Sequence, residues 1–181
     1  MSGAIPGVSW YGAFRVVVFA LLICNTAYYL VAGTPSKGLD ALAWLLLLML
    51  FVLETGFSGR LYTPGIAVAV RIARIIAAIG VCAAGAGYLV EQDSLDAINS
   101  GLWIAVVILL EVEVRRPRAV AHHHIWFAAT AGALYTGLAV LVLSWAWRNE
   151  WMDAYDALLW LIAFAAIEMD LLALKRAQVT A

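Results

Sequence analysis

Charged residues are scarce in this sequence. Asp, Glu, Lys and Arg make up 13% of its 181 residues, whereas about a quarter of a typical soluble domain is charged. Hydrophobic residues make up 65%, and the mean hydropathy is +0.94. A chain of this size has no core that could bury so much apolar surface. The composition therefore excludes a soluble enzyme and a disordered chain, and it predicts an integral membrane protein.

An excess of positive charge is also lacking. Eleven Lys and Arg residues stand against twelve Asp and Glu residues, for a formal net charge of −1. This balance gives no reason to expect a nucleic-acid partner. The partners that we expect are the lipid bilayer and either further copies of the chain or other membrane subunits.

Cysteine and the common motifs of catalysis are nearly absent. The only two cysteines, Cys24 and Cys82, lie within apolar runs, so we expect small buried residues and no disulfide framework. The chain has no phosphate-binding glycine loop, no Cys/His zinc pattern and no nucleophile elbow. We therefore expect no cofactor.

Long apolar runs dominate what is present. Because a bilayer core about 30 Å thick requires roughly 20 apolar residues per helix, we looked for segments of that length. Six segments qualify: 11–32, 39–57, 67–90, 97–114, 124–147 and 153–174. None shows the alternation of an outer-membrane strand. The sequence predicts an all-α integral membrane protein with six transmembrane helices, a single membrane domain over residues 1–181 and no soluble domain.

The distribution of Lys and Arg predicts the orientation, because cytoplasmic loops are enriched in both. If both termini are cytoplasmic, nine of these residues lie on the inner side: Arg15, Arg60, Arg71, Arg74, Arg115, Arg116, Arg118, Lys175 and Arg176. Only Lys37 and Arg148 lie outside. We expect a multi-pass protein of a bacterial inner membrane with both termini in the cytoplasm.

A pattern recurs in the second, fourth and sixth segments. Each has an Asp or Asn, a Trp four residues later and a Glu or Asp ten residues after the Trp. The residues are Asp40, Trp44 and Glu54; Asn99, Trp103 and Glu113; and Asp156, Trp160 and Asp170. This spacing places all three on one helical stripe. It predicts three repeated αα-hairpins, about 11–57, 67–114 and 124–174. We expect the first Asp or Asn to suit a helix N-terminus as a cap, and the tryptophans to join an interfacial aromatic belt.

Each hairpin also carries a base at the start of its first helix. The bases are Arg15, Arg74 and His124. We expect them to pair with Glu54, Glu113 and Asp170, respectively, and these acids to point into the protein. Pairing offsets part of the cost of placing a charge in the membrane.

Three carboxylates lie within apolar sequence near the predicted inner edge: Glu111, Glu168 and Asp170. An intramembrane acid is a functional hypothesis by default. The structural alternative pairs Glu111 with Arg115, one helical turn away, and Asp170 with a base on the fifth segment.

The histidines form one cluster, His122, His123 and His124. Consecutive residues of a regular helix point about 100° apart, so the three cannot all bind one metal ion. A metal site would need His122 or His124 together with an acid such as Glu111 or Glu168. That signal is weak, and we expect no metal.

Other polar and small residues within the segments predict helix packing. Asn25, Thr26, Thr130, Tyr135 and Thr136 are candidates for hydrogen bonds between helices, and the glycine-rich stretches 80–87 and 128–137 are candidates for close helix contacts.

Three classes of function remain open. The first is a non-enzymatic scaffold or accessory subunit of a membrane assembly, which fits the absence of a soluble domain. The second is a transporter or channel for an ion or small molecule, because internal repeats are common in transporters. The third is a membrane redox or lipid-soluble-substrate enzyme subunit that would use the inner acids and histidines. The first is the one we favour.

Overall fold

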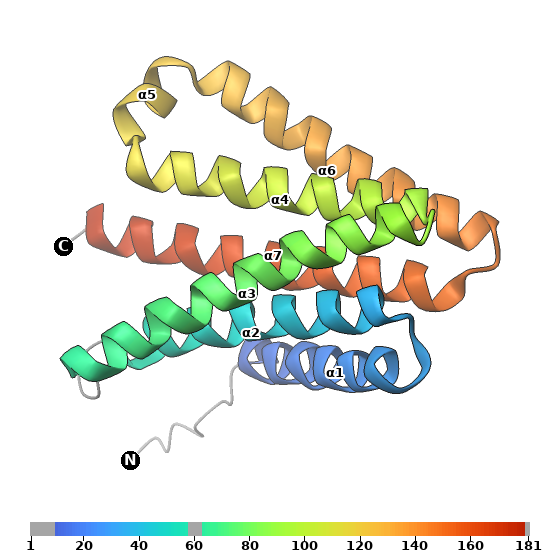
Figure 1. Cartoon of the computed structure of the whole chain (residues 1–181). Helices are drawn as coiled ribbons and strands as arrows, with labels where there is room; N and C mark the ends of the chain where they lie inside the picture. Colours follow the sequence, from blue (N-terminus) through green and yellow to red (C-terminus); the bar gives the residue numbers. More distant parts are fainter. Residues whose placement is uncertain (1–9, 58–62, 180–181) are drawn as a thin grey trace, which may run out of the picture. The chain divides into compact units, whose positions relative to one another are not determined.

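The computed structural model describes residues 10–57 and 63–179, and this part of the chain is helical without any strand. It contains seven helices: α1 (Trp10–Ala32), α2 (Pro35–Phe57), α3 (Pro64–Val90), α4 (Ser94–Arg115), α5 (Pro117–His122), α6 (His124–Trp147) and α7 (Trp151–Val179) (Figure 1). Each of the six predicted segments lies within or nearly within one long helix. The short helix α5 was not predicted, since six residues carry no clear periodicity.

Five of these helices are long and apolar enough to cross a membrane: Gly12–Ala32, Pro35–Glu54, Gly65–Val90, Ser94–Glu113 and His124–Trp147. The all-helical, membrane-compatible architecture is thereby confirmed. The sixth predicted span lies in α7, whose side chains are described only as far as Ala166. Its passage through the membrane, and the orientation of the chain, remain predictions.

The turns that precede α4 and α7 have the same backbone geometry. Gln92 and Asn149 are both in the left-handed region, with φ of 60° and 64°. The following amides, of Asp93 and Glu150, donate to the carbonyls of Tyr88 and Trp145, five residues earlier. This is the Schellman pattern, in which a residue with positive φ ends one helix. Both turns therefore reverse the chain in the same way.

The helix caps are not the predicted ones. Asp93 is the N-cap of α4, and its side chain accepts from the amide of Asp96. Thr34 acts similarly before α2, since its hydroxyl accepts from the amide of Lys37. The acids and amide that we had expected to cap lie deeper. Asp40, Asn99 and Asp156 each come five residues after the first residue of their helix, so the capping interpretation was wrong.

The chain divides into two compact units. Among the described residues, 10–25 and 142–179 form one, and 26–141 form the other. The division falls inside α1 and α6 and not at the boundaries of the predicted hairpins. In the larger unit, α3 packs against both α2 and α4, and α5 adjoins the end of α4 (Figure 1). In the smaller unit, Asn25 of α1 donates to the carboxylate of Asp156 on α7.

The glycines of α3 allow close contact with its neighbours. A Cβ at Gly80 would lie 3.2 Å from the Cβ of Ala43 on α2, and one at Gly87 would lie 2.2 Å from the hydroxyl of Ser36. The predicted packing role is confirmed for this stretch. In α6 it holds only for Gly137, which faces Leu102, because Gly132 has no neighbour within 4 Å.

Several residues are placed differently from the prediction. Trp44, Trp103 and Trp160 are only 8%, 4% and 6% exposed, so they pack inside the protein and are not belt residues. Trp145 is buried as well, whereas Trp126, Trp147 and Trp151 are exposed. Cys24 and Cys82 are free but exposed, which contradicts their predicted burial. A helix pointing part of its surface at lipid can place such small residues outward without cost.

Candidate functional site

Polar side chains gather where α2 and α4 begin and where α3 ends, within the larger unit. We call this group the polar cluster; its members are Thr34, Ser36, Lys37, Asp40, Tyr88, Glu91, Asp96, Asn99 and Ser100. The two helix reversals bring these residues together, because α2 and α4 run in the same direction on either side of α3.

Glu91 closes the surface side of the polar cluster. Its carboxylate accepts one hydrogen bond from Ser36, at 2.6 Å, and one from Thr34, at 2.8 Å. The bond from Ser36, helped by the one from Thr34, lowers the pKa of Glu91 below its usual value, although burial opposes the effect. Glu91 is the C-cap residue of α3. The two bonds therefore tie the end of α3 to the first turn of α2 and to the residue just before it.

Lys37 and Asp96 form an ion pair between α2 and α4. The Nζ–Oδ2 distance is 3.0 Å, and the side chains are only 17% and 9% exposed. The ammonium group also lies 6.0 Å from the centre of the Tyr29 ring, within the range of a cation–π contact. Two charges this far from water depend on each other, since removing one strands the other.

Asp40 lies deeper and bonds to α3. Its Oδ2 accepts from the hydroxyl of Tyr88, at 3.3 Å, and the indole of Trp44 also lies within hydrogen-bonding reach. Its other oxygen, Oδ1, is buried and has no hydrogen-bond partner. Asn99 Oδ1 and Ser100 Oγ on α4 are buried and without a hydrogen-bond partner too. These three oxygens of the polar cluster therefore remain available to a ligand.

Trp44 and Trp103 end the polar cluster on its apolar side. Their ring centroids are 6.2 Å apart, at an interplanar angle of 58°. Both the tryptophan pair and the Lys37–Asp96 pair join positions that are 59 residues apart. Within each helix the two contacts are seven residues apart, which is two turns. Side chains of α2 and α4 therefore meet in register at two levels, although each helix packs its backbone against α3. We call this line of side-chain contacts the seam.

The opposite end of the larger unit carries ion pairs that are mostly exposed. Glu54 of α2 pairs with Arg74 of α3, a partner that the sequence analysis did not give it. Glu111 pairs with Arg115 one turn along α4, which confirms the structural alternative for this acid. Glu113 is exposed, although we had expected it to point into the protein. The pairings of Arg15 with Glu54 and of Arg74 with Glu113 stay predictions.

The remaining inner acids lie outside the described side chains. These are Glu168 and Asp170, so their roles and the pairing of Asp170 with His124 also stay predictions.

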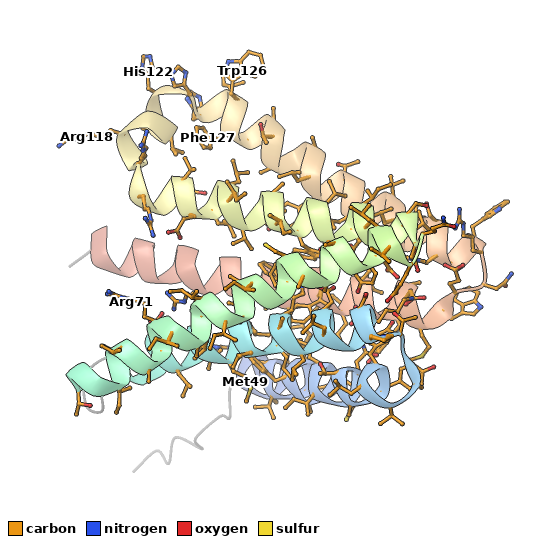
Figure 2. The ribbon with its side chains drawn as sticks, viewed as in Figure 1. Met49, Arg71, Arg118, His122, Trp126 and Phe127 are labelled. Carbon is orange, nitrogen blue, oxygen red and sulfur yellow. The ribbon has the colours of Figure 1, made fainter. Side chains whose placement is uncertain are left out.

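The three histidines lie at the junction of α5 and α6. His122 ends α5, His123 is in a turn and His124 begins α6, so they do not form the regular helix that we had assumed. All three are exposed, and the rings of His122 and His123 meet edge to face with centroids 4.6 Å apart. Figure 2 shows His122 and Trp126 at this junction, pointing away from α4. Among the side chains that the structure describes, no three His, Cys, Asp or Glu groups could hold a metal ion together.

Two of the polar residues within the spans have defined bonds. Asn25 bonds between helices, to Asp156, as predicted. The hydroxyl of Thr136 instead donates to the carbonyl of Gly132 in its own helix, at 2.7 Å. A threonine within a helix commonly satisfies itself in this way.

Sequence reasoning missed the contributions of Tyr88, Lys37, Asp96 and Ser100. One available signal was the 59-residue offset of the repeat, which relates Lys37 to Asp96 as it relates Trp44 to Trp103.

Comparison with known proteins adds no further constraint: no family model matches the chain, and neither a curated protein nor a solved structure shows significant similarity to it.

Proposed function

We propose that the chain consists of three repeated αα-hairpins with six membrane spans, α7 being the last, and that both termini are cytoplasmic. Three local equivalences support the repeat. The turns at Gln92 and Asn149 share one geometry, the recurring Asp or Asn has the same place in α2, α4 and α7, and Trp44 contacts its counterpart Trp103. The nine-to-two division of Lys and Arg supports the orientation.

Single cysteines test this topology in a chain whose two native cysteines are replaced by Ala. On intact cells, a membrane-impermeant maleimide should label cysteines at positions 92 and 149. A cysteine at position 118 should react only after the inner membrane is permeabilised. Labelling of position 118 on intact cells would contradict the orientation.

The function that we propose is that of a non-enzymatic scaffold or accessory subunit of a membrane assembly. The observation that supports this proposal is that charged and polar side chains bond one helix to another. Ser36–Glu91 and Lys37–Asp96 join helix to helix where α2 and α4 begin and α3 ends, and Arg74–Glu54 joins α3 to the other end of α2. Meanwhile α3 presents a stripe of exposed branched apolar residues on the outside: Val68, Ile72, Ile75, Ile76 and Ile79. The exposed apolar stripe is therefore available for packing against another membrane helix.

Photo-crosslinking in native membranes tests the proposal. Benzoylphenylalanine would replace Ile76 of α3 or Leu143 of α6, which are 60% and 69% exposed. We expect discrete protein adducts in the membrane: an adduct of twice the chain mass would identify a second copy, and any other defined mass another subunit. The matched control is the same labelled chain diluted in detergent, where the adducts should disappear. Adducts with lipid alone at both positions would contradict a role in an assembly.

Transport of an ion is the second candidate, and one observation favours it. The buried oxygens of Asp40, Asn99 and Ser100 lack hydrogen-bond partners. Oxygens that line an ion pathway must likewise be free to contact the ion. Reconstituted liposomes with a sodium or proton gradient would test it, since a transporter should dissipate one gradient and an Asp40→Asn variant should not.

A further inference from the structure

Three buried oxygens of the polar cluster, on Asp40, Asn99 and Ser100, have no hydrogen-bond partner, and two contacts between α2 and α4 indicate where the first two lie. On α2, Asp40 lies three residues after Lys37 and four before Trp44; on α4, Asn99 lies three after Asp96 and four before Trp103. Because Lys37 pairs with Asp96 and the Trp44 ring lies near that of Trp103, helical periodicity places Asp40 and Asn99 on the helix faces that meet at the seam. Asp40 and Asn99 therefore face each other between an ion pair on one side and a pair of indoles on the other.

Helix α3 forms the third wall at the same level. Tyr88 donates to Asp40, and one turn away the Cβ position of Gly85 lies 2.9 Å from Ser100 Oγ. Ser100 is 1% exposed. Its hydroxyl thus points at the face of α3 that also carries Tyr88. A side chain at position 85 would clash with this hydroxyl, and glycine avoids the clash.

The charges around Asp40 leave its carboxylate without a compensating cation. The other titratable members of the polar cluster are Lys37 on α2, Tyr88 and Glu91 at the end of α3, and Asp96 on α4, and only Lys37 is a cation. The ammonium of Lys37 is already bonded to Asp96, and Tyr88 is neutral at ordinary pH. Within the described residues, Asp40 forms no ion pair. A buried carboxylate in this position must take up either a cation or a proton.

The donor atoms indicate which cation. The three atoms are a carboxylate, an amide carbonyl and a hydroxyl oxygen, and neither sulfur nor imidazole is present. Oxygen donors suit hard cations and not transition metals. Ca²⁺ sites usually carry several carboxylates, whereas a single carboxylate balances a single positive charge. A proton could join only Asp40 to Asn99 and would leave Ser100 unsatisfied, whereas a metal ion can contact all three oxygens.

We propose that the seam between α2, α3 and α4 holds a binding site for one alkali-metal cation, with sodium as its probe, formed by Asp40 Oδ1, Asn99 Oδ1 and Ser100 Oγ. Tyr88 is a positioning residue, because its bond to Oδ2 orients the carboxylate. The site does not depend on the scaffold role. The bound ion could be a structural ion or an ion that the protein transports.

The full-length protein in detergent or nanodiscs allows a direct test. Binding of ²²Na⁺ should saturate at one ion per chain, and the melting temperature should rise with NaCl but not with choline chloride at equal ionic strength. Asp40→Asn and Ser100→Ala should lose both effects. Asp156→Asn is the matched control, because this acid has the same place in its own helix but accepts a bond from Asn25; it should bind ²²Na⁺ like the native chain.

Two results would overturn the cation site. The first is an absence of saturable ²²Na⁺ binding by a folded native chain. The second is a melting temperature that responds to pH and not to sodium, with the response lost in Asp40→Asn, because Asp40 would then carry a proton. Ser100→Ala keeps the test valid if Asp40→Asn fails to fold, since it removes one oxygen and leaves the charge unchanged.

Discussion

The indole of Trp44 in α2 lies 6.2 Å, centroid to centroid, from that of Trp103 in α4, its counterpart in the predicted repeat. The contact joins two helices that run in the same direction and are not consecutive in the chain. Together with the Lys37–Asp96 ion pair it aligns α2 with α4.

Truncation of Trp103 should destabilise the protein severely. Trp103 is 4% exposed, and replacing a buried Trp with Ala typically costs about 3–5 kcal/mol, because it removes apolar contact and leaves a cavity. Unfolding in a detergent titration should report this loss for Trp103→Ala. Trp126→Ala provides the control, since Trp126 is 74% exposed and its loss should change stability by less than about 0.5 kcal/mol. Equal effects of the two substitutions would mean that the indole pair contributes nothing.

Replacing one partner of the Lys37–Asp96 pair should lower the free energy of unfolding more than replacing both partners. Lys37→Met leaves Asp96 charged and largely buried, and the loss of one partner of a buried pair costs about 3–5 kcal/mol. The double variant Lys37→Met, Asp96→Leu removes both charges and should recover most of that loss. A double-mutant cycle on thermal unfolding measures the coupling. If the two single losses simply added in the double variant, the ion pair would have no role in joining α2 to α4.

The contribution of Glu91 to stability should vanish in acid. Because Ser36 and Thr34 lower its pKa in the folded protein, the unfolded chain takes up the proton at the higher pH. The stabilisation is therefore complete above about pH 5, beyond the unfolded pKa of about 4.3, and is lost as the pH falls through the lower folded value. Melting temperatures of the native chain and of Glu91→Gln should differ at pH 7 and converge toward pH 3.

Ser36→Ala is the control for this pH dependence. This substitution removes the hydrogen bond from Ser36 to Glu91. In the Ser36→Ala background, the difference in melting temperature between Glu and Gln at position 91 should therefore already be smaller at pH 7. A difference that stays constant from pH 7 to pH 3 would show that the bonds from Ser36 and Thr34 do not act on the carboxylate.

Glycine at position 92 should stabilise the turn between α3 and α4. Gln92 has a φ of 60°, a conformation that costs an ordinary residue roughly 1–2 kcal/mol and glycine almost nothing. Gln92→Gly should therefore raise the melting temperature. Asn149→Gly is the matched control in the equivalent turn, where the gain should be smaller because Asn tolerates this region. A loss of stability in Gln92→Gly would indicate that the side chain of Gln92 contributes more than its backbone costs.

The chain sequence by itself determined the helices. Each predicted segment lies in a helix. The physical reason is that a run of about 20 apolar residues suits a membrane, where only internal hydrogen bonds could satisfy the backbone. The stripe of Asp40, Trp44 and Glu54 also followed from spacing alone, since helical periodicity places these residues on one face. The local partner of Glu111 was predictable for the same reason, because Arg115 lies one turn away.

Only the tertiary structure decided which partners meet between helices. Glu54 pairs with Arg74 because α3 lies directly against α2, and no periodicity within a helix reveals its neighbours. The polar cluster depends on two chain reversals that bring Tyr88 to Asp40 and Lys37 to Asp96. Burial of Trp44 and Trp103 has the same origin: a tryptophan near a helix end suits a lipid interface or a protein core equally well, and the packing of α2 and α4 around α3 placed both inside.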